Sequence, residues 1–184
     1  MMTLDERVLV LPGWLGSGPE HWQSRWEALH GFQRVQQSEW QWPLRGDWMA
    51  QLEEAVLAAP GRVRLAAHSL GCHLVAAWAA HSSHTERVAG ALLVAPPDLE
   101  QPDTPPPVAR WRPVVRRPLP FPALVLYSED DPFASAAASR ALAADWRVPA
   151  ESLGARGHLN AESGLGDWPE GVAKLAALGP VAAR

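Results

Sequence analysis

The sequence predicts an α/β protein in which about six mostly parallel strands are flanked by helices. The first observation behind this is that short apolar runs alternate along the chain with longer stretches of helical spacing, which is the order of βαβ units. The second is the length of 184 residues, which suits one domain with a sizeable core. The sequence has no internal repeat. We therefore expect a single domain over residues 1–184.

The expected strands are short, rich in apolar and β-branched residues, and mostly bounded by turn signals. The first, Val8–Leu11, is entirely apolar and ends at Pro12-Gly13, as a buried parallel strand does. The weakest pattern is that of the second strand, Phe32–Gln37. The remaining strands are expected at Arg62–Ala66, Ala91–Ala95, Ala123–Tyr127 and Glu151–Leu153.

Helices are expected between these strands. Ser17–Glu20 resembles a capping box and precedes tryptophans at helical spacing, and Asp47 is placed to cap the next helix. The helix after Ser69 is apolar on nearly every side, as a central helix is. Two later helices are expected, the alanine-rich Ala134–Trp146 and one that includes Val172–Leu178.

One region, Pro96–Pro122, is irregular. It contains ten of the 18 prolines of the chain, which excludes a regular helix or a central strand. Two interpretations remain, a plain connection across the sheet and a short lid over a site. We favour the connection.

The most informative stretch is Ala67–Gly71, which reads Ala-His-Ser-Leu-Gly between an expected strand and an expected helix. A serine between small residues at such a turn is typical of a nucleophile elbow, here with Ala67 in place of the first glycine. The sharp turn strains the serine backbone, and a bulky residue two positions before or after Ser69 would collide with its neighbours. Ala67 and Gly71 meet this requirement, so Ser69 is the expected nucleophile.

A serine hydroxyl needs a base within hydrogen-bond reach and a third group that orients the base. Asp130 and Asp131 follow the fifth expected strand, and His158 follows the sixth. The chain order serine, acid, histidine is that of α/β-hydrolases. We expect His158 to be the base and Asp131 to orient it, because Pro132 makes the chain turn directly after Asp131. Asp130 is then expected to be a solvated loop carboxylate.

An oxyanion that forms on the substrate needs two hydrogen-bond donors. The backbone N–H of Leu70, directly after the nucleophile, is the expected first donor. The second is expected from the loop after the first strand, Pro12–Gly16, where we favour the N–H of Trp14. The indole of Trp14 is also expected to form one wall of an apolar pocket.

The other histidines and the cysteine are not expected to take part in the chemistry. His68 is interpreted as a packed or hydrogen-bonded side chain. For His21 a structural role is the default, and a part in fixing the oxyanion loop is the alternative. His81 and His84 lack a third ligand nearby, which argues against a zinc site and favours a solvated helix end. Cys72, the only cysteine, reads as a small core residue. We expect no metal and no cofactor.

Composition excludes several classes of protein. The net charge is −4 and Lys174 is the only lysine, so no nucleic-acid partner is expected. The N-terminal residues lack the pattern of a signal peptide, and no apolar run is long enough to span a bilayer. With one cysteine, no intrachain disulfide can form. We expect a cytoplasmic protein that does not associate with membranes.

Four stretches occur together in order along the chain: Pro12–Trp26, Ala67–Gly71, Asp130–Pro132 and Gly157–Asn160. With them the chain resembles the small serine hydrolases grouped with retinoblastoma-binding protein 9 and the bacterial YdeN-type proteins. The resemblance covers roughly residues 6–178, and its most specific part is the stretch from Pro12 to Trp26.

The resemblance implies a minimal α/β-hydrolase fold with no large cap. It also implies a triad that carries onto Ser69, Asp131 and His158, and it favours the second of the paired aspartates. The leading hypothesis is a serine hydrolase that cleaves small esters, thioesters or amides through an acyl-enzyme. Two alternatives remain: acyl transfer to an acceptor other than water, and a non-catalytic module that binds a protein partner, since one member of the family is described through such a partner.

Overall fold

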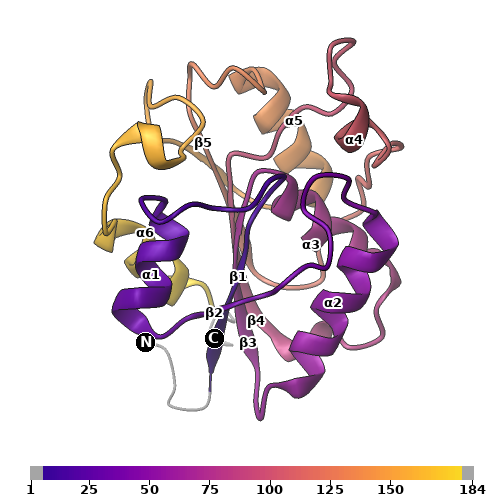
Figure 1. Cartoon of the computed structure of the whole chain (residues 1–184), viewed down its shortest axis with the longest axis vertical. Helices are drawn as coiled ribbons and strands as arrows, with labels where there is room; N and C mark the ends of the chain where they lie inside the picture. The colour runs from indigo at the N-terminus through magenta and orange to yellow at the C-terminus, as the bar shows by residue number, and fades with distance from the viewer. Residues whose placement is uncertain (1–5, 180–184) are drawn as a thin grey trace.

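The computed structural model describes residues 6–179 as a six-stranded parallel sheet with helices on both faces (Figure 1). The strands lie in the order β2-β1-β3-β4-β5-β6, and every neighbouring pair is parallel. Their bounds are Arg7–Leu11 (β1), Gln33–Arg34 (β2), Val63–His68 (β3), Val88–Val94 (β4), Ala123–Tyr127 (β5) and Ala150–Ser152 (β6). The predicted fold class is confirmed.

The strands at the centre of the sheet are longer than predicted and the edge strand is shorter. The strand β3 continues to His68, and β4 begins three residues before the predicted Ala91. The strand β2 has only two residues, and one further hydrogen bond, from the N–H of Val35 to the carbonyl of Val10, follows them toward β1. Because β1 lies between β2 and β3, its carboxyl end opens a crevice at a topological switch point.

Two groups of helices bury the two faces of the sheet. Figure 1 shows α1 and α6 on one side and α2 and α3 on the other. Alternating strand residues divide accordingly: Leu9 and Leu65 belong to the core under α2, α3 and α5, whereas Val8 and Ala66 pack with α1 and α6. The bounds are Trp22–His30 (α1), Arg45–Ala58 (α2), Leu70–His81 (α3), Thr85–Arg87 (η1), Pro106–Ala109 (α4), Ala136–Trp146 (α5), Ala161–Ser163 (η2) and Pro169–Ala177 (α6). Between residues 6 and 179, no helix has the length and apolar character that a membrane span requires.

Both predicted helix caps are wrong. The cap of α1 is His21, whose Nδ1 accepts a hydrogen bond from the N–H of Gln23. The hydroxyl of Ser17 donates instead to the side chain of Gln23. The helix α2 begins two residues before Asp47, after Leu44, which gives no side-chain cap. An unprotonated imidazole nitrogen can accept the same N–H that a serine or aspartate oxygen would accept, and sequence rules for caps give little weight to histidine.

The segment Pro96–Pro122 connects β4 to β5, and it contains one short helix where none was predicted. The helix α4 starts at Pro106, where a proline fits because the first helical N–H has no partner to lose. Beyond it, Trp111 is buried and its indole donates to the carbonyl of Pro43 at 2.9 Å. The connection is therefore packed against the loop before α2.

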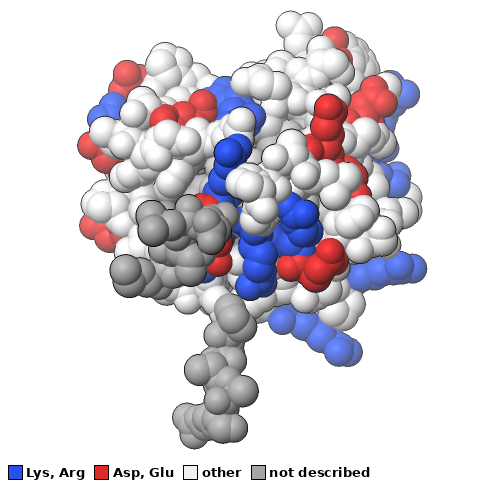
Figure 2. Space-filling view, turned by 90° about the horizontal axis from the view of Figure 1, so that it is seen from below, with Lys and Arg blue, Asp and Glu red and all other residues white. Residues whose placement is uncertain are grey.

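The amino-terminal edge of the sheet is rich in arginine. Figure 2 views the molecule from this side and shows blue side chains gathered near the middle of the face, with red ones beside them. Arg64 pairs with Glu6 at 2.7 Å and donates to the carbonyl of Leu175, while Arg87 donates to the carbonyl of Gly61. Both guanidinium groups therefore bind partners within the fold.

Candidate active site

The turn between β3 and α3 places Ser69 at the carboxyl edge of the sheet. Its backbone has φ 55° and ψ −124°, a conformation that non-glycine residues rarely adopt. The N–H of Ser69 donates to the carbonyl of Val94 at 2.9 Å, which fixes the turn to the end of β4. The strained turn lifts the serine side chain above the sheet, as the sequence predicts for an elbow.

Close packing around the elbow explains its small residues. A Cβ added to Gly71 would overlap the carbonyl of Leu11, so only glycine fits there without a shift of backbone. A Cβ added to Gly13 would lie 2.9 Å from Cβ of Ser69. Ala67 is completely buried and is the next-to-last residue of β3. The loop after β1 and the elbow thus pack directly against each other.

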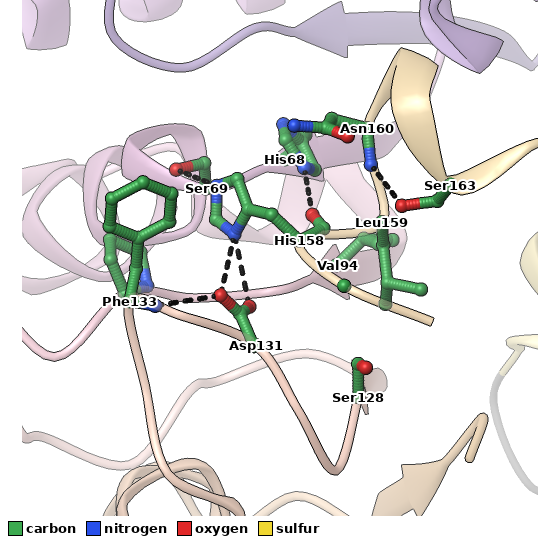
Figure 3. A network of polar contacts seen from close by, with 12 residues as sticks. His68, Ser69, Val94, Ser128, Asp131, Phe133, His158, Leu159, Asn160 and Ser163 are labelled. Atoms are coloured by element: carbon green, nitrogen blue, oxygen red, sulfur yellow. Dashed lines mark hydrogen bonds and ion pairs between the residues drawn. The ribbon is translucent and has the colours of Figure 1, made fainter. Parts of the chain in front are cut away.

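The three residues predicted for the triad come together at this edge (Figure 3). The Nε2 atom of His158 lies 3.0 Å from Oγ of Ser69. Its Nδ1 atom lies 3.0 Å from each carboxylate oxygen of Asp131. Side-chain exposure is 11% for His158 and 2% for Asp131, so the pair is largely withdrawn from water. The carboxylate also accepts the N–H of Phe133 at 2.9 Å, which fixes its orientation.

Asp130, the neighbouring carboxylate, joins two loops. One oxygen, Oδ1, accepts the N–H of Gly157 and the hydroxyl of Ser128, both at 2.8 Å. The Ser128 hydroxyl in turn accepts the N–H of Arg156. These hydrogen bonds, that of Gly157 first, hold the pKa of Asp130 below its usual range. Asp130 is an exposed loop carboxylate, as expected, and it also holds the loop that carries His158.

The two predicted oxyanion donors lie on the segments that pack together. A Cβ added to Gly13, directly before Trp14, would lie 3.2 Å from the backbone nitrogen of Leu70. Within residues 6–179, neither the N–H of Trp14 nor that of Leu70 donates a hydrogen bond to another group. The indole Nε1 of Trp14 donates to the carbonyl of Gln41 at 2.8 Å, which tethers this loop. Both backbone donors are therefore free to bind a ligand oxygen.

A cleft of about 450 Å³ opens above Ser69 and His158. Its walls come from the loop after β1, the Pro96–Pro122 connection and the loop after β5. The apolar lining residues are Trp14, Leu15, Leu70, Pro97, Leu99, Pro105, Val108, Pro132 and Phe133. The polar ones, besides Ser69 and His158, are Gln101, Asp103, Thr104 and Asn160. The irregular connection thus joins two strands and also forms a wall of the cleft.

Phe133 is a site residue that the sequence analysis missed. Its ring centroid lies 4.6 Å from that of His158 in an edge-on arrangement, and Figure 3 shows the ring beside the imidazole. About half of its surface, 48%, is exposed to solvent. The Asp-Asp-Pro-Phe order placed a phenylalanine two residues after the candidate acid, which was the one available signal.

Cys72 is a buried core residue, as expected, and His81 and His84, expected at a solvated helix end, make hydrogen bonds within the fold. Cys72 is buried, its thiol donates to the carbonyl of Val94, and burial raises the pKa of the thiol. His84 pairs with Glu53 at 2.6 Å, and His81 bonds to a carbonyl of its own helix. Among residues 6–179 there is no group of three or more histidine, cysteine, aspartate or glutamate side chains placed to hold a metal ion.

Comparisons with known proteins identify the family and the fold of the chain. A family model described as serine hydrolase matches residues 8–177. A structure described as a YdeN-like hydrolase from Pectobacterium atrosepticum shares 28% identity, covers 95% of this chain and 90% of its own, and superposes with a TM-score of 0.83. No curated protein sequence matches the chain.

More distant structures share the fold. The ydeN gene product of B. subtilis is 19% identical, covers 94% of this chain and 97% of its own, and has a TM-score of 0.72. The esterase RhEst1 from Rhodococcus sp. is 16% identical, with 95% and 91% covered and a TM-score of 0.67. The predicted resemblance to small YdeN-type serine hydrolases is confirmed. Because the family model spans nearly all of the described residues, the chain belongs to the serine hydrolase family, with an α/β-hydrolase fold and no large cap.

Proposed function

We propose that this hydrolase cleaves small ester, thioester or amide substrates through an acyl-enzyme on Ser69. One observation carries the proposal: the unbroken series of hydrogen bonds from Asp131 through His158 to Ser69, at the floor of a largely apolar cleft. A strained serine, a base at 3.0 Å and a buried acid are the parts that serine acylation requires.

In the first half of the reaction, Nε2 of His158 takes the proton of Ser69 as its Oγ attacks the substrate carbonyl carbon. Asp131 accepts the Nδ1–H of the imidazole and stabilises the positive charge that forms there. The carbonyl oxygen becomes an oxyanion, which the free N–H groups of Leu70 and Trp14 bind. The bond to the leaving alcohol, thiol or amine then breaks, and His158 gives that group its proton.

In the second half, water takes the place of the leaving group. His158 removes a proton from the water as its oxygen attacks the acyl carbon, and the same oxyanion donors serve again. The bond between the acyl carbon and Oγ breaks, the proton returns to Ser69, and a carboxylic acid leaves. An acceptor alcohol or amine in place of water would make the chain an acyltransferase by the same steps.

The cleft favours short acyl groups. It is open, its lining is mostly apolar, and its wall from Pro96–Pro122 is a connection rather than a separate cap. Burial of each CH₂ group contributes about 0.8 kcal/mol, so a long acyl chain gains affinity only where a tunnel surrounds it. We expect acetyl to butyryl esters to be the best model substrates.

The test is labelling with a fluorophosphonate, which reacts with activated serines, followed by turnover of p-nitrophenyl acetate. The chain should be labelled, and Ser69→Ala should abolish labelling and reduce kcat by about 10⁶-fold, as is typical for loss of a serine nucleophile. Ser82→Ala is the matched control: Ser82 caps the far end of α3 and should leave both readouts unchanged. Absence of labelling in the folded wild type would instead favour a non-catalytic binding module. Undiminished turnover in Ser69→Ala would remove Ser69 from the mechanism.

A further inference from the structure

Two buried histidines link the N-terminus of α1 to the backbone of His158. The Nε2 atom of His21 lies 3.3 Å from Nδ1 of His68. The Nε2 atom of His68 lies 2.9 Å from the carbonyl oxygen of His158, a bond that Figure 3 shows. Both residues are buried, with His21 4% and His68 5% exposed. We call His21 and His68 the histidine chain.

The two ends of the histidine chain fix its protons independently. The carbonyl of His158 can only accept, so Nε2 of His68 must carry a proton, and in the neutral ring Nδ1 is then an acceptor. At the other end, Nδ1 of His21 accepts the N–H of Gln23, so the proton of a neutral His21 is on Nε2. A donor on His21 therefore faces an acceptor on His68. The arrangement is complete only when both rings are neutral.

Burial keeps the rings neutral. Desolvation, followed by the charge of Arg34 and the proximity of His158, lowers the pKa of His21 to about 4. Desolvation also lowers the pKa of His68 well below its usual range, with His21 and His158 adding to the effect. The groups from neighbouring elements that act on the two histidines are thus Arg34 and His158.

The backbone next to the carbonyl that His68 holds is strained at Leu159. Leu159, directly after His158, is fully buried and has φ 52°, a value in the left-handed region. Its carbonyl accepts the indole N–H of Trp22 at 2.9 Å. Consecutive carbonyls, those of His158 and Leu159, are therefore held by side chains from β3 and α1. Such strain persists only where surrounding contacts determine the conformation.

We propose that His21 and His68 are positioning residues for the reaction: by holding the carbonyl of His158, they set the distance between its imidazole and Ser69. The inference rests on the proposed function, because it gives His158 the part of the base. A shift of about 1 Å in such a group lowers turnover by about 100-fold. His68 belongs to the same strand that presents Ser69, so the nucleophile and the backbone of its base are attached to one element.

The first test compares His68→Leu with His68→Gln, whose amide keeps an N–H donor for the carbonyl. With p-nitrophenyl acetate, His68→Leu should lower kcat by about 100-fold while KM stays within about threefold. His68→Gln should restore at least about tenfold of that loss. Val56→Ala, a cavity in the core under α2, is the control for general destabilisation and should keep the wild-type kcat. A folded His68→Leu variant with the wild-type kcat, or no recovery in His68→Gln, would overturn the proposal.

The second test needs no variant. Long-range ¹H–¹⁵N correlation spectra of the wild-type chain at neutral pH should show His21 and His68 as neutral rings protonated at Nε2. A charged ring, or a proton on Nδ1 of either residue, would overturn the proposal even if a variant fails to fold. Fluorophosphonate labelling of the same sample separates the two proposals. If the chain is not labelled but shows the expected tautomers, the hydrolase mechanism is refuted, whereas the hydrogen bonds between His21, His68 and the carbonyl of His158 are supported.

Discussion

The serine and the histidine of the site are held in place by different means. Ser69 is fixed by backbone packing between neighbouring segments, where Gly13 and Gly71 allow main chains to approach closely. His158 lies on a loop that is fixed by side chains from distant parts of the sequence, including His68 and Asp130. Steric packing does not depend on protonation, whereas these hydrogen bonds do. The serine side is therefore held by close backbone packing, and the histidine side is held by side-chain hydrogen bonds.

After loss of the nucleophile itself, the largest effect should come from the pair of aspartates on the histidine side. Asp131→Asn should lower kcat by about 10⁴-fold, because an amide in place of the carboxylate favours the wrong tautomer of His158. Asp130→Asn should lower kcat far less, by about 10- to 100-fold, because it only removes the hydrogen bonds that hold the loop at Gly157. Steady-state rates of both variants give the comparison. A larger loss in Asp130→Asn would reverse the two roles.

On the serine side, Gly71→Ala should disturb the elbow directly. The added methyl group would overlap the carbonyl of Leu11, and overpacking of this kind costs about 1–3 kcal/mol. Turnover should fall by about 100-fold as Ser69 shifts. Urea denaturation and p-nitrophenyl acetate turnover measure the two effects.

The matched control is Gly46→Ala in α2, where an added Cβ meets nothing within 4 Å. It should be neutral or stabilise the chain by about 0.5–1 kcal/mol. If Gly71→Ala has the same stability and turnover as Gly46→Ala, close backbone packing does not hold the elbow in place.

Lowering the pH should destabilise the whole fold through its buried histidines. His21, His68 and His73 are buried, and desolvation lowers the pKa of each, to about 4 for His21 and His73. The unfolded chain therefore binds protons first as the pH falls below about 6.5, which favours unfolding. The stability present above that pH should be lost progressively toward pH 4, by about 1.4 kcal/mol per pH unit for each histidine.

Urea denaturation at a series of pH values measures this loss. His73→Leu should reduce the slope of stability against pH, and Val56→Ala should lower the whole curve without changing its slope. A flat curve over this range would mean that the buried histidines titrate normally.

The smallest effect should come from the cleft wall. Trp14→Ala should raise KM for short esters by about tenfold, because it removes binding shared by substrate and transition state. The value of kcat should stay closer to that of the wild type, because the backbone N–H is kept although the indole hydrogen bond to Gln41 is lost. Trp42→Ala is the control, since Trp42 is 52% exposed and does not line the cleft. A series of p-nitrophenyl esters should show kcat/KM falling beyond about C8. A steady rise to about C12 would indicate an acyl tunnel.

The serine side could be predicted from the sequence because its determinants are local. Five consecutive residues specify the elbow, and the alternation of strands and helices places Ser69, Asp131 and His158 at one edge of the sheet. The sequence could not show that Asp130 binds Gly157, or that His21 reaches His68, since these contacts join loops that only the folded sheet brings together. The cap of α1 was missed for a different reason: the contact between His21 and Gln23 is local, but sequence rules for caps give little weight to histidine.

The buried position of Cys72 makes the chain convenient for labelling studies. The thiol donates to the carbonyl of Val94 inside the core, and its raised pKa leaves almost no reactive thiolate at neutral pH. A maleimide dye should therefore not react with the native protein. One new surface cysteine, such as Leu29→Cys on the exposed face of α1, would carry a fluorophore at a single known position, with the native cysteine left in place.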